Sequence, residues 1–434
     1  MFPELSTHLS SPTRPEAPTP AALPLDPLRE RALLLTLAGI QFCHILDFMI
    51  MMPLGPILIR ALGIDTHEFG LLVSAYTFTA GFSGMLAAIF VDRFERKRLL
   101  LAMFALFAVA TLACGLAFGF WSLLLARCAA GAFGGVLGAM VQTMVGDLIP
   151  FERRGRASGT IMSAFSLSTI AGVPVSLYLA NHFGWRFPFI FIAVLSCGFF
   201  LLGWKKLPSL RGHLRASIVT ESERVHPFTA MLEVLRDANH LRSLAFMALV
   251  IFSGFSVIPY ITIYAVGNVG IAQEDIFMIY LAGGAATFFT SRLIGRLADA
   301  RGKVMTYRLI ALCSILPLFI QTHLGPVPLW LMVAVSTLFF ILVPGRMVPA
   351  MAIVTSAAQP RLRGTFLAMI GSVQQLAAGM ATYIGGLIIA VDAAGNIVRY
   401  DQVGYLAIAT TLAAIGFVGL IRMHTGSEDL PALK

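Results

Sequence analysis

Long apolar segments dominate this sequence and limit what the chain can fold into. A helix needs about 20 predominantly apolar residues to cross the hydrocarbon core of a bilayer, and segments of that length recur along most of the chain. Charged residues make up only 12% of the chain, against about 25% in soluble domains. We therefore predict an all-α polytopic membrane protein. The twelve predicted spans are 32–59, 69–91, 99–118, 121–148, 158–180, 187–204, 243–266, 277–297, 305–323, 329–357, 365–391 and 403–421.

The distribution of basic residues predicts the orientation of these spans. An even number of spans places both termini on one side, and most of the 31 Lys and Arg residues fall in the termini and loops of that side. Arg60, Arg186 and Arg399 fall on the opposite side. Because loops rich in Lys and Arg stay in the cytoplasm, we expect both termini to be cytoplasmic. The same bias accounts for the net charge of +9, so no nucleic-acid partner is expected.

The cysteines and the loops give a weaker indication of the compartment. All five cysteines fall within predicted spans, which argues against a disulfide framework. The sequence contains no Asn-x-Ser/Thr glycosylation signal, and its loops on the side opposite the termini are short. These features fit a multi-pass protein of a bacterial inner (plasma) membrane.

A long polar stretch divides the predicted spans into two sets of six. It is rich in Lys and Arg, and Pro227 could open a short helix within it. The apolar face of that helix (Phe228, Met231, Leu232 and Leu235) would lie on the membrane surface or pack on the ends of the spans. The N-terminal tail holds seven prolines in its first 28 residues and is expected to be disordered. The expected domains are a cytoplasmic tail at 1–30, a six-helix bundle at 31–204, a cytoplasmic linker at 205–242, a second six-helix bundle at 243–423 and a cytoplasmic tail at 424–434.

The two sets of spans repeat each other at an offset of about 207 residues. The sequence Asp92–Lys97 after span two corresponds to Asp299–Lys303 after span eight. In spans one and seven, Asp47 corresponds to Ser253. Parallel repeats about an axis normal to the membrane are typical of one transporter architecture. We therefore expect two pseudo-symmetric six-helix bundles with a path between them near the bilayer midplane.

Several motifs resemble those of one transporter family. Gly295-Arg-Leu-Ala-Asp299-Ala-Arg-Gly302-Lys303 resembles the loop motif Gly-x-x-x-Asp-x-x-Gly-Lys/Arg of the major facilitator superfamily, although Ala88 and Glu95 replace its glycines in the first half. The other motifs similar to those of the family are Arg127-Cys-Ala-Ala-Gly131, Pro53-Leu-Gly-Pro56, Gly172-Val-Pro174-Val-Ser176 and Gly184-Trp185-Arg186. The resemblance covers roughly residues 31–423. It implies the major facilitator fold, of the twelve-helix drug/proton antiporter or sugar-efflux permease type.

The repeated loop motif predicts a conformational latch. Glycine at the end of a span allows close approach of a neighbouring helix, and the basic cluster beyond it can pair with carboxylates or helix ends of the facing half. The alternative is that the basic residues only enforce topology. The predicted latch residues are Asp92, Arg93, Arg96, Lys97, Gly295, Asp299, Gly302 and Lys303.

Asp47 is the carboxylate that lies deepest in a predicted span, near mid-bilayer. Acids at such depth usually line a pathway or find a partner. Burial favours the neutral acid, whereas a nearby arginine favours the carboxylate, and this competition suits a proton-coupled switch. We predict a proton-coupling site of Asp47, His44 one turn earlier, and Arg127 of span four. The alternative is a fixed ion pair of Asp47 with Arg127, and His44 could be a packing residue.

Arg346 lies deep in span ten, between Pro344-Gly345 and Pro349. A broken helix that carries a charge is a pointer to a binding site, so we predict a substrate contact; the alternative is a structural kink. The other predicted substrate residues are Gln374, Gln375, Tyr260, Tyr264 and Asn268. Since Arg127, Arg292 and Arg346 outnumber Asp47, the aspartate deep inside a span, the cavity should favour neutral or anionic substrates.

No nucleotide-binding loop, metal-ligand cluster or nucleophile-base arrangement stands out in the sequence. We expect no enzyme activity, no cofactor and no metal, and a monomer in the lipid bilayer that draws on an ion gradient. The leading hypothesis is proton-coupled efflux of a small organic compound by alternating access. The alternatives are proton-linked uptake or facilitated diffusion of a sugar or metabolite, and a transporter-like membrane sensor.

Overall fold

The computed structural model describes residues 27–91, 94–149, 151–208, 227–392 and 396–423. The expected tails and most of the expected linker lie outside the described residues, as do Asp92 and Arg93 of the predicted latch. The first half consists of α1 (Pro27–Ile50), α2 (Gly55–Leu62), α3 (Thr66–Phe90), α4 (Arg96–Gly115), α5 (Phe120–Leu148), α6 (Phe151–Leu167), the π-helix η2 (Ser168–Gly172), α7 (Val173–Phe183) and α8 (Phe187–Lys206).

The second half is also helical apart from a short hairpin. It consists of α10 (Pro227–Arg236), α11 (Ala238–Phe255), η3 (Ile258–Tyr260), α12 (Ile261–Tyr264), η4 (Ala265–Val269), η5 (Gln273–Asp275), α13 (Ile276–Arg301), α14 (Lys303–His323), α15 (Leu329–Leu342), α16 (Met347–Ala357), η6 (Pro360–Leu362), α17 (Arg363–Ile388), β1 (Ala390–Val391), β2 (Ile397–Val398), α18 (Tyr400–Phe417) and η7 (Val418–Leu420). The two strands pair antiparallel.

The predicted twelve-span fold is confirmed. Eleven helical segments of the described chain are long and apolar enough to cross a membrane. The twelfth span is α17, whose 26 residues would extend about 39 Å at 1.5 Å per residue. Its lower apolarity has a structural reason, because α17 packs along α3 of the other half and meets protein on that face.

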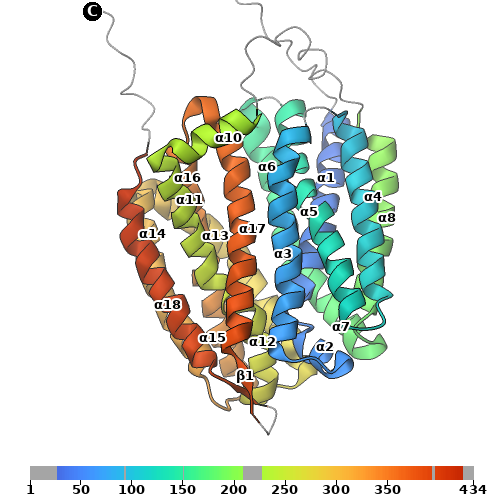
Figure 1. Cartoon of the computed structure of the whole chain (residues 1–434), viewed down its shortest axis with the longest axis vertical. Helices are drawn as coiled ribbons and strands as arrows, with labels where there is room; N and C mark the ends of the chain where they lie inside the picture. Colours follow the sequence, from blue (N-terminus) through green and yellow to red (C-terminus); the bar gives the residue numbers. More distant parts are fainter. Residues whose placement is uncertain (1–26, 92–93, 150, 209–226, 393–395, 424–434) are drawn as a thin grey trace, which may run out of the picture.

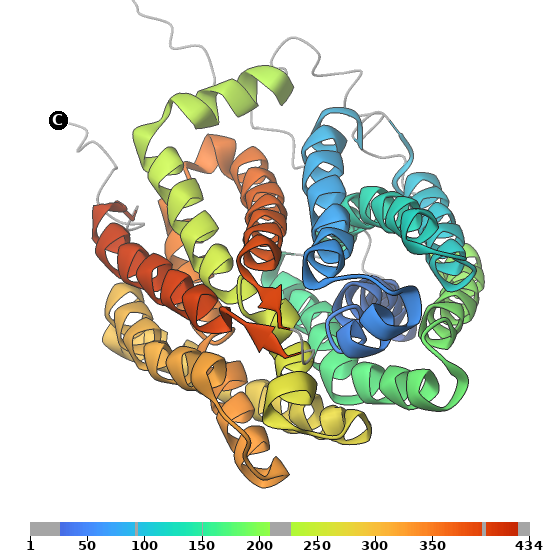
Figure 2. The same cartoon turned by 60° about the horizontal axis from the view of Figure 1, so that its bottom comes forward.

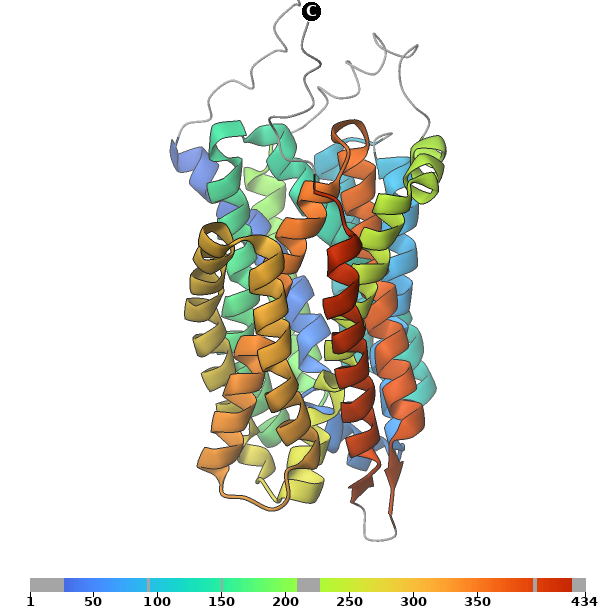
Figure 3. The same ribbon diagram turned by 90° about the vertical axis from the view of Figure 1, so that its left-hand side faces the viewer.

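The two halves lie side by side and touch along two seams. One seam is α3 against α17 (Figure 2); the other is α13 against η2 and α7. The described chain begins and ends on the same face of the bundle, here called the terminal face (Figure 1 and Figure 3). Helix α2 and strand β1 lie at the opposite face, called the distal face.

Several contacts join the halves near the distal face. The hydroxyl of Thr66 donates to the carbonyl oxygen of Ile389 at 3.5 Å, and the ring centroids of Phe69 and Tyr260 are 6.2 Å apart. Between α2 and α12, a Cβ on Gly55 would meet the side chain of Ile263 at 2.6 Å. The halves are therefore tightly packed at this end.

Proline residues break three of the spans. Span one, predicted as one helix, ends at Ile50 and resumes at Gly55 as α2, because Pro53 has no N–H for the helix ladder and Pro56 favours the first turn of a new helix. Span seven is broken before Pro259, where η3 begins. Span ten is interrupted between α15 and α16, around Pro344, as the sequence predicts.

A short helix, α10, lies in the segment where a surface helix is expected. Its buried residues are Ala230 and Val234, which belong to a hydrophobic cluster of the second half. Phe228, Leu232 and Leu235 of the predicted apolar face are exposed instead. Met231, the fourth residue of that face, packs against the cluster. The helix therefore packs on the ends of the spans through Ala230, Val234 and Met231.

Candidate proton and substrate sites

A buried ion pair joins the first and fourth spans of the first half. The Oδ2 atom of Asp47 on α1 lies 2.8 Å from Nη1 of Arg127 on α5, and both side chains are fully buried. The same Nη1 lies 3.3 Å from the backbone carbonyl oxygen of Asp47. The structure thus brings together two of the three residues predicted for proton coupling.

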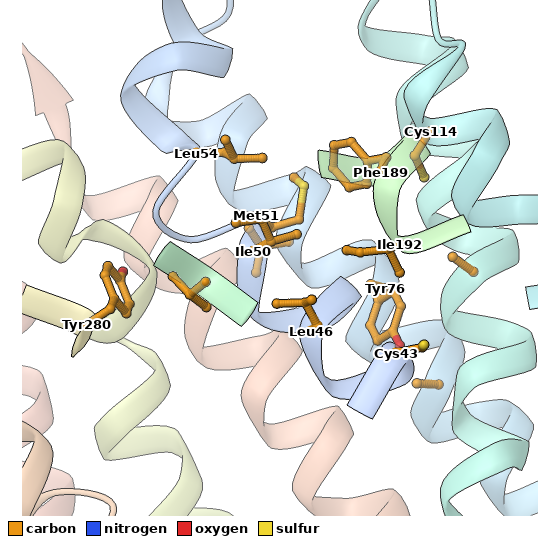
Figure 4. Packing of buried hydrophobic residues seen from close by; sticks show 14 of the residues in the cluster. Cys43, Leu46, Ile50, Met51, Leu54, Tyr76, Cys114, Phe189, Ile192 and Tyr280 are labelled. Atoms are coloured by element: carbon orange, nitrogen blue, oxygen red, sulfur yellow. The ribbon is translucent and has the colours of Figure 1, made fainter. Parts of the chain in front are cut away.

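Tyr76 of α3 completes this site and was not predicted from the sequence. Its ring centroid lies 4.3 Å from Cζ of Arg127, a distance at which the ring face attracts a cation. Tyr76 belongs to the same apolar cluster as Cys43 and Leu46, which lie around it in Figure 4. The feature of the sequence that could have indicated Tyr76 is its position as a tyrosine in the middle of an apolar span. In this apolar setting the charges interact more strongly than they would in water.

The polar groups around the ion pair are not all satisfied by the protein. Asp47 Oδ1, both ring nitrogens of His44, and Nε and Nη2 of Arg127 are buried without a hydrogen-bond partner in the described chain. The hydroxyl groups of Tyr76 and Thr111 share this property. Buried polar groups are usually hydrogen-bonded, so this cluster has capacity to bind protons and water. Its members come from α1, α3, α4 and α5.

The α5 glycines explain how the helices approach closely enough to form this site. A Cβ on Gly131 or Gly135 would collide with a backbone carbonyl oxygen of α3, and a Cβ on Gly134 would meet the His44 ring. A Cβ on Gly138 would meet nothing within 4 Å. The stripe of small residues therefore serves packing, and Gly138 takes no part in it.

Arg346 occupies the break between α15 and α16 and is only 1% exposed. Its Nη2 donates to the Ser253 hydroxyl at 2.6 Å and to the Val250 carbonyl oxygen at 3.3 Å. Its Nη1 donates to the hydroxyls of Thr411 at 2.9 Å and Ser314 at 3.4 Å. None of these partners carries a charge, and no carboxylate of the described residues forms an ion pair with Arg346.

The two halves therefore share the same arrangement of residues but differ in net charge. In each half, an arginine on the fourth span is held by a residue on the first span: Arg127 by Asp47, and Arg346 by Ser253. The carboxylate neutralises the arginine in the first half. The hydroxyl leaves the arginine of the second half positive.

A cavity of about 240 Å³ lies between the halves. Its lining comes from spans one, five, seven, eight and ten, and it is mostly apolar. Among the lining residues are Phe48, Met49, Thr169, Phe255, Phe340 and Arg346. The rings of Phe48 and Phe255, from opposite halves, have centroids 5.9 Å apart. Of the six predicted substrate residues, all within the described chain, Arg346 alone lines this cavity.

The other five predicted substrate residues lie outside the cavity lining. The Tyr260 hydroxyl donates to the carbonyl oxygen of Thr382, Tyr264 packs on Tyr400, and Asn268 makes two bonds to the backbone of Ile397. These residues brace the distal end of span seven. Gln374 contacts the sulfur of Met351, and Gln375 is half-buried.

The described latch residues contact their own half. Lys303 Nζ donates to the Ser356 hydroxyl at 2.7 Å, and Lys97 Nζ donates to the carbonyl oxygen of Trp204 at 2.8 Å. Arg96 reaches the carbonyl oxygen of Val91. Asp299 is exposed, and Gly302 adopts φ of 90°, a conformation that favours glycine. Gly295 has room around it, with one side chain 3.9 Å from a Cβ position.

The two six-helix halves, with a cavity between them and a charged site in each, define a membrane transporter built on parallel repeats. Comparison with known proteins identifies the group. The chain belongs to the Major Facilitator Superfamily, whose sequence model matches residues 37–382.

Individual relatives are distant. The chain is 25% identical over 270 residues to a "Probable sugar efflux transporter" of Helicobacter pylori (strain HPAG1), covering 61% of this chain and 66% of that protein. It is 25% identical over 374 residues to the "Uncharacterized MFS-type transporter YwfA" of Bacillus subtilis (strain 168), covering 86% of each. The first match therefore spans slightly less than two thirds of its relative's length.

A solved structure shares the fold. It is that of a bacterial homolog to the human lysosomal transporter Spinster, in an inward-facing and occupied conformation. The TM-score is 0.72 with 16% sequence identity, covering 91% of this chain and 97% of the other. The same protein in an inward-facing and unoccupied conformation gives a TM-score of 0.65.

Proposed function

We propose that this protein exports a small organic compound in exchange for protons by alternating access. The relatives named as sugar efflux transporters support export. The basic loops and termini support a cytoplasmic terminal face, and the bacterial relatives support a bacterial inner membrane.

The buried pair of Asp47 and Arg127 carries the proton-coupling part of the proposal. Protonation of the carboxylate would remove one charge of the pair and leave Arg127 uncompensated in an apolar site. Breaking a buried pair in this way costs about 3–5 kcal/mol, which is enough to shift a conformational equilibrium strongly. The ring centroid of His44 lies 6.3 Å from that of Tyr76, and both of its ring nitrogens are buried without a partner in the described chain. We propose that His44 passes the proton.

The loop motifs would act as the latch between conformations. In this conformation Lys97 and Lys303 bind within their own halves, while contacts at the distal face join the halves. When the distal face opens, we propose that the loop motifs, including Asp92 and Arg93, close the terminal face. The domain boundaries expected from the sequence belong to this proposal, with the tails and linker as connecting segments.

The test of proton coupling is Asp47→Asn, which mimics the permanently protonated state. The variant should fold with lower stability, because a neutral amide costs less to bury than a carboxylate but leaves Arg127 without its counter-charge. In proteoliposomes it should still exchange substrate across the bilayer but lose accumulation driven by an imposed pH gradient. The substrate would be a compound found by thermal-stabilisation screening of drugs, sugars and organic anions.

Glu274→Gln is the matched control, since it removes a carboxylate from an exposed position. It should leave both activities intact. Retention of pH-driven transport by Asp47→Asn would remove the carboxylate from the coupling mechanism. Loss of both activities in a destabilised protein would show that the ion pair is structural.

A further inference from the structure

We infer that the substrate is a small amphipathic anion, with one negatively charged head group that binds Arg346 and an apolar or aromatic body that fills the cavity between the halves. This inference rests on the proposed transport function and names the chemical class of its substrate. It follows from the positive charge of Arg346, from the free donor of its guanidinium, and from the lining and size of the cavity.

The charge balance of the spans places one positive charge at the cavity. Arg127 is neutralised by Asp47. Arg292 is exposed and stacks on Phe288, 4.5 Å from its ring centroid. Among the residues that line the cavity, all of them described, Arg346 is the one with a charge. An isolated buried charge is costly unless it is paired, so an anion is the ligand that this site favours most.

The guanidinium of Arg346 retains a free donor. Its two Nη atoms are occupied by hydroxyl and carbonyl oxygens, whereas the buried Nε has no partner in the described chain. Charge-assisted bonds from arginine to an oxyanion are stronger than bonds between neutral groups.

The remaining polar groups of the lining have little to offer a sugar. Besides Arg346, three lining side chains are polar: Ser166, Thr169 and Thr287. The hydroxyl of Thr287 donates to the carbonyl oxygens of Gly283 and Phe340, and that of Thr169 donates to the carbonyl oxygen of Phe165. A sugar needs many hydrogen bonds to replace those it makes with water. A lining of aromatic rings and methionines around one cation suits an apolar body with one anionic head.

The pseudo-symmetry of the halves points to the same class of ligand. In the first half, the carboxylate of Asp47 balances the arginine of span four; in the second, Ser253 occupies the corresponding place. A bound anion would supply the charge that the second half lacks. The cavity of about 240 Å³ is below the usual range of about 300–1,000 Å³ for sites of drug-sized ligands, so the anion is small.

The probe for this inference is 4-phenylbutyrate, compared with its neutral amide and with a trimethylammonium analogue of the same phenylalkyl body. Binding to the purified protein in nanodiscs is measured by calorimetry near neutral pH, without any proton gradient. The carboxylate should bind about ten- to a hundredfold more tightly than either analogue, as expected for a charge-assisted bond in a buried site.

Two variants test the role of Arg346 in different ways. Arg346→Gln removes the charge, and Ser253→Asp supplies an internal carboxylate like that of Asp47. Both should abolish the preference for the carboxylate, and Ser253→Asp should do so in a stable protein because it pairs the buried arginine. Arg346→Lys should keep part of the preference. Arg292→Gln removes an equal charge away from the cavity and should leave the preference unchanged.

The outcomes separate this inference from the proposed function. Equal binding of the three probes by the wild type, or no binding, would overturn the inference, as would a carboxylate preference that survives in Ser253→Asp. None of these results depends on a pH gradient. Conversely, loss of coupling is measured with Asp47→Asn alone, so proton antiport can fail while the anion preference stands.

Discussion

At the residue scale, the two arginines buried in the fourth spans differ in what their neighbours supply. Arg127 has a carboxylate at 2.8 Å and an aromatic face at 4.3 Å. Arg346 has hydroxyl and carbonyl oxygens. Because a buried pair is neutral overall and a hydroxyl-bound arginine is not, the first is suited to holding a proton and the second to holding an anion.

The contribution of Tyr76 to the proton site can be measured in a double-mutant cycle. Tyr76→Leu should lower stability more in the wild type than in Asp47→Asn/Arg127→Gln, by about 0.5–2 kcal/mol, because the ring attracts the cation only while it is present. Tyr76→Phe keeps the ring and removes a hydroxyl without a partner, so it should cost little. Thermal unfolding of the purified variants gives these values. A coupling of zero would mean that Tyr76 only fills space.

At the scale of the helices, breaks and glycines position the sites. The break between α15 and α16 places Arg346 at the start of a new helix, where it reaches α11 and α18. The glycines of α5 bring its backbone against α3, so that Tyr76 can cover Arg127. Both devices let polar groups meet inside an apolar bundle.

The glycine stripe of α5 gives a graded prediction. Gly131→Ala and Gly135→Ala place a methyl group against a carbonyl oxygen of α3 and should destabilise the protein by about 1–3 kcal/mol each. Gly138→Ala is the control on the same helix, because its methyl group meets open space and alanine is the better helix former. Thermal unfolding should rank Gly138→Ala at or above the wild type. Equal losses at all three positions would contradict this packing.

At the scale of the whole molecule, the two halves meet along α3 and α17 and along α13 with η2 and α7. The distal contacts of Thr66, Phe69 and Gly55 join the halves at one end.

A cross-link across the distal seam should stop transport. In a background without native cysteines, Thr66→Cys with Ile389→Cys joined by a short bifunctional reagent should abolish counterflow, because alternating access requires the halves to separate there. Anion binding should persist. The control is Asn239→Cys with Arg422→Cys, which lie in contact within one half and should tolerate the link. Undiminished counterflow in the linked Thr66/Ile389 protein would exclude opening at this seam.

The sequence by itself determined the fold class, because apolar length and the placement of charge act locally and need no knowledge of neighbours. The break of span ten could be predicted for the same reason. Proline removes a backbone hydrogen-bond donor whatever elements the helix packs against. Asp47, Arg127 and Arg346 could be singled out for the same reason, since a charge in an apolar span demands a partner.

The tertiary structure decided which partner each charge meets. Tyr76 covers Arg127, and Ser253, Ser314 and Thr411 hold Arg346; these contacts depend on how spans rotate and cross, which periodicity in an almost uniformly apolar helix does not reveal. Tyr260 and Asn268 look like ligand groups in sequence but bond to backbone atoms in the fold. A side chain in a span becomes a binding group only when packing leaves its polar atoms free toward a cavity, and that is a property of the assembled bundle.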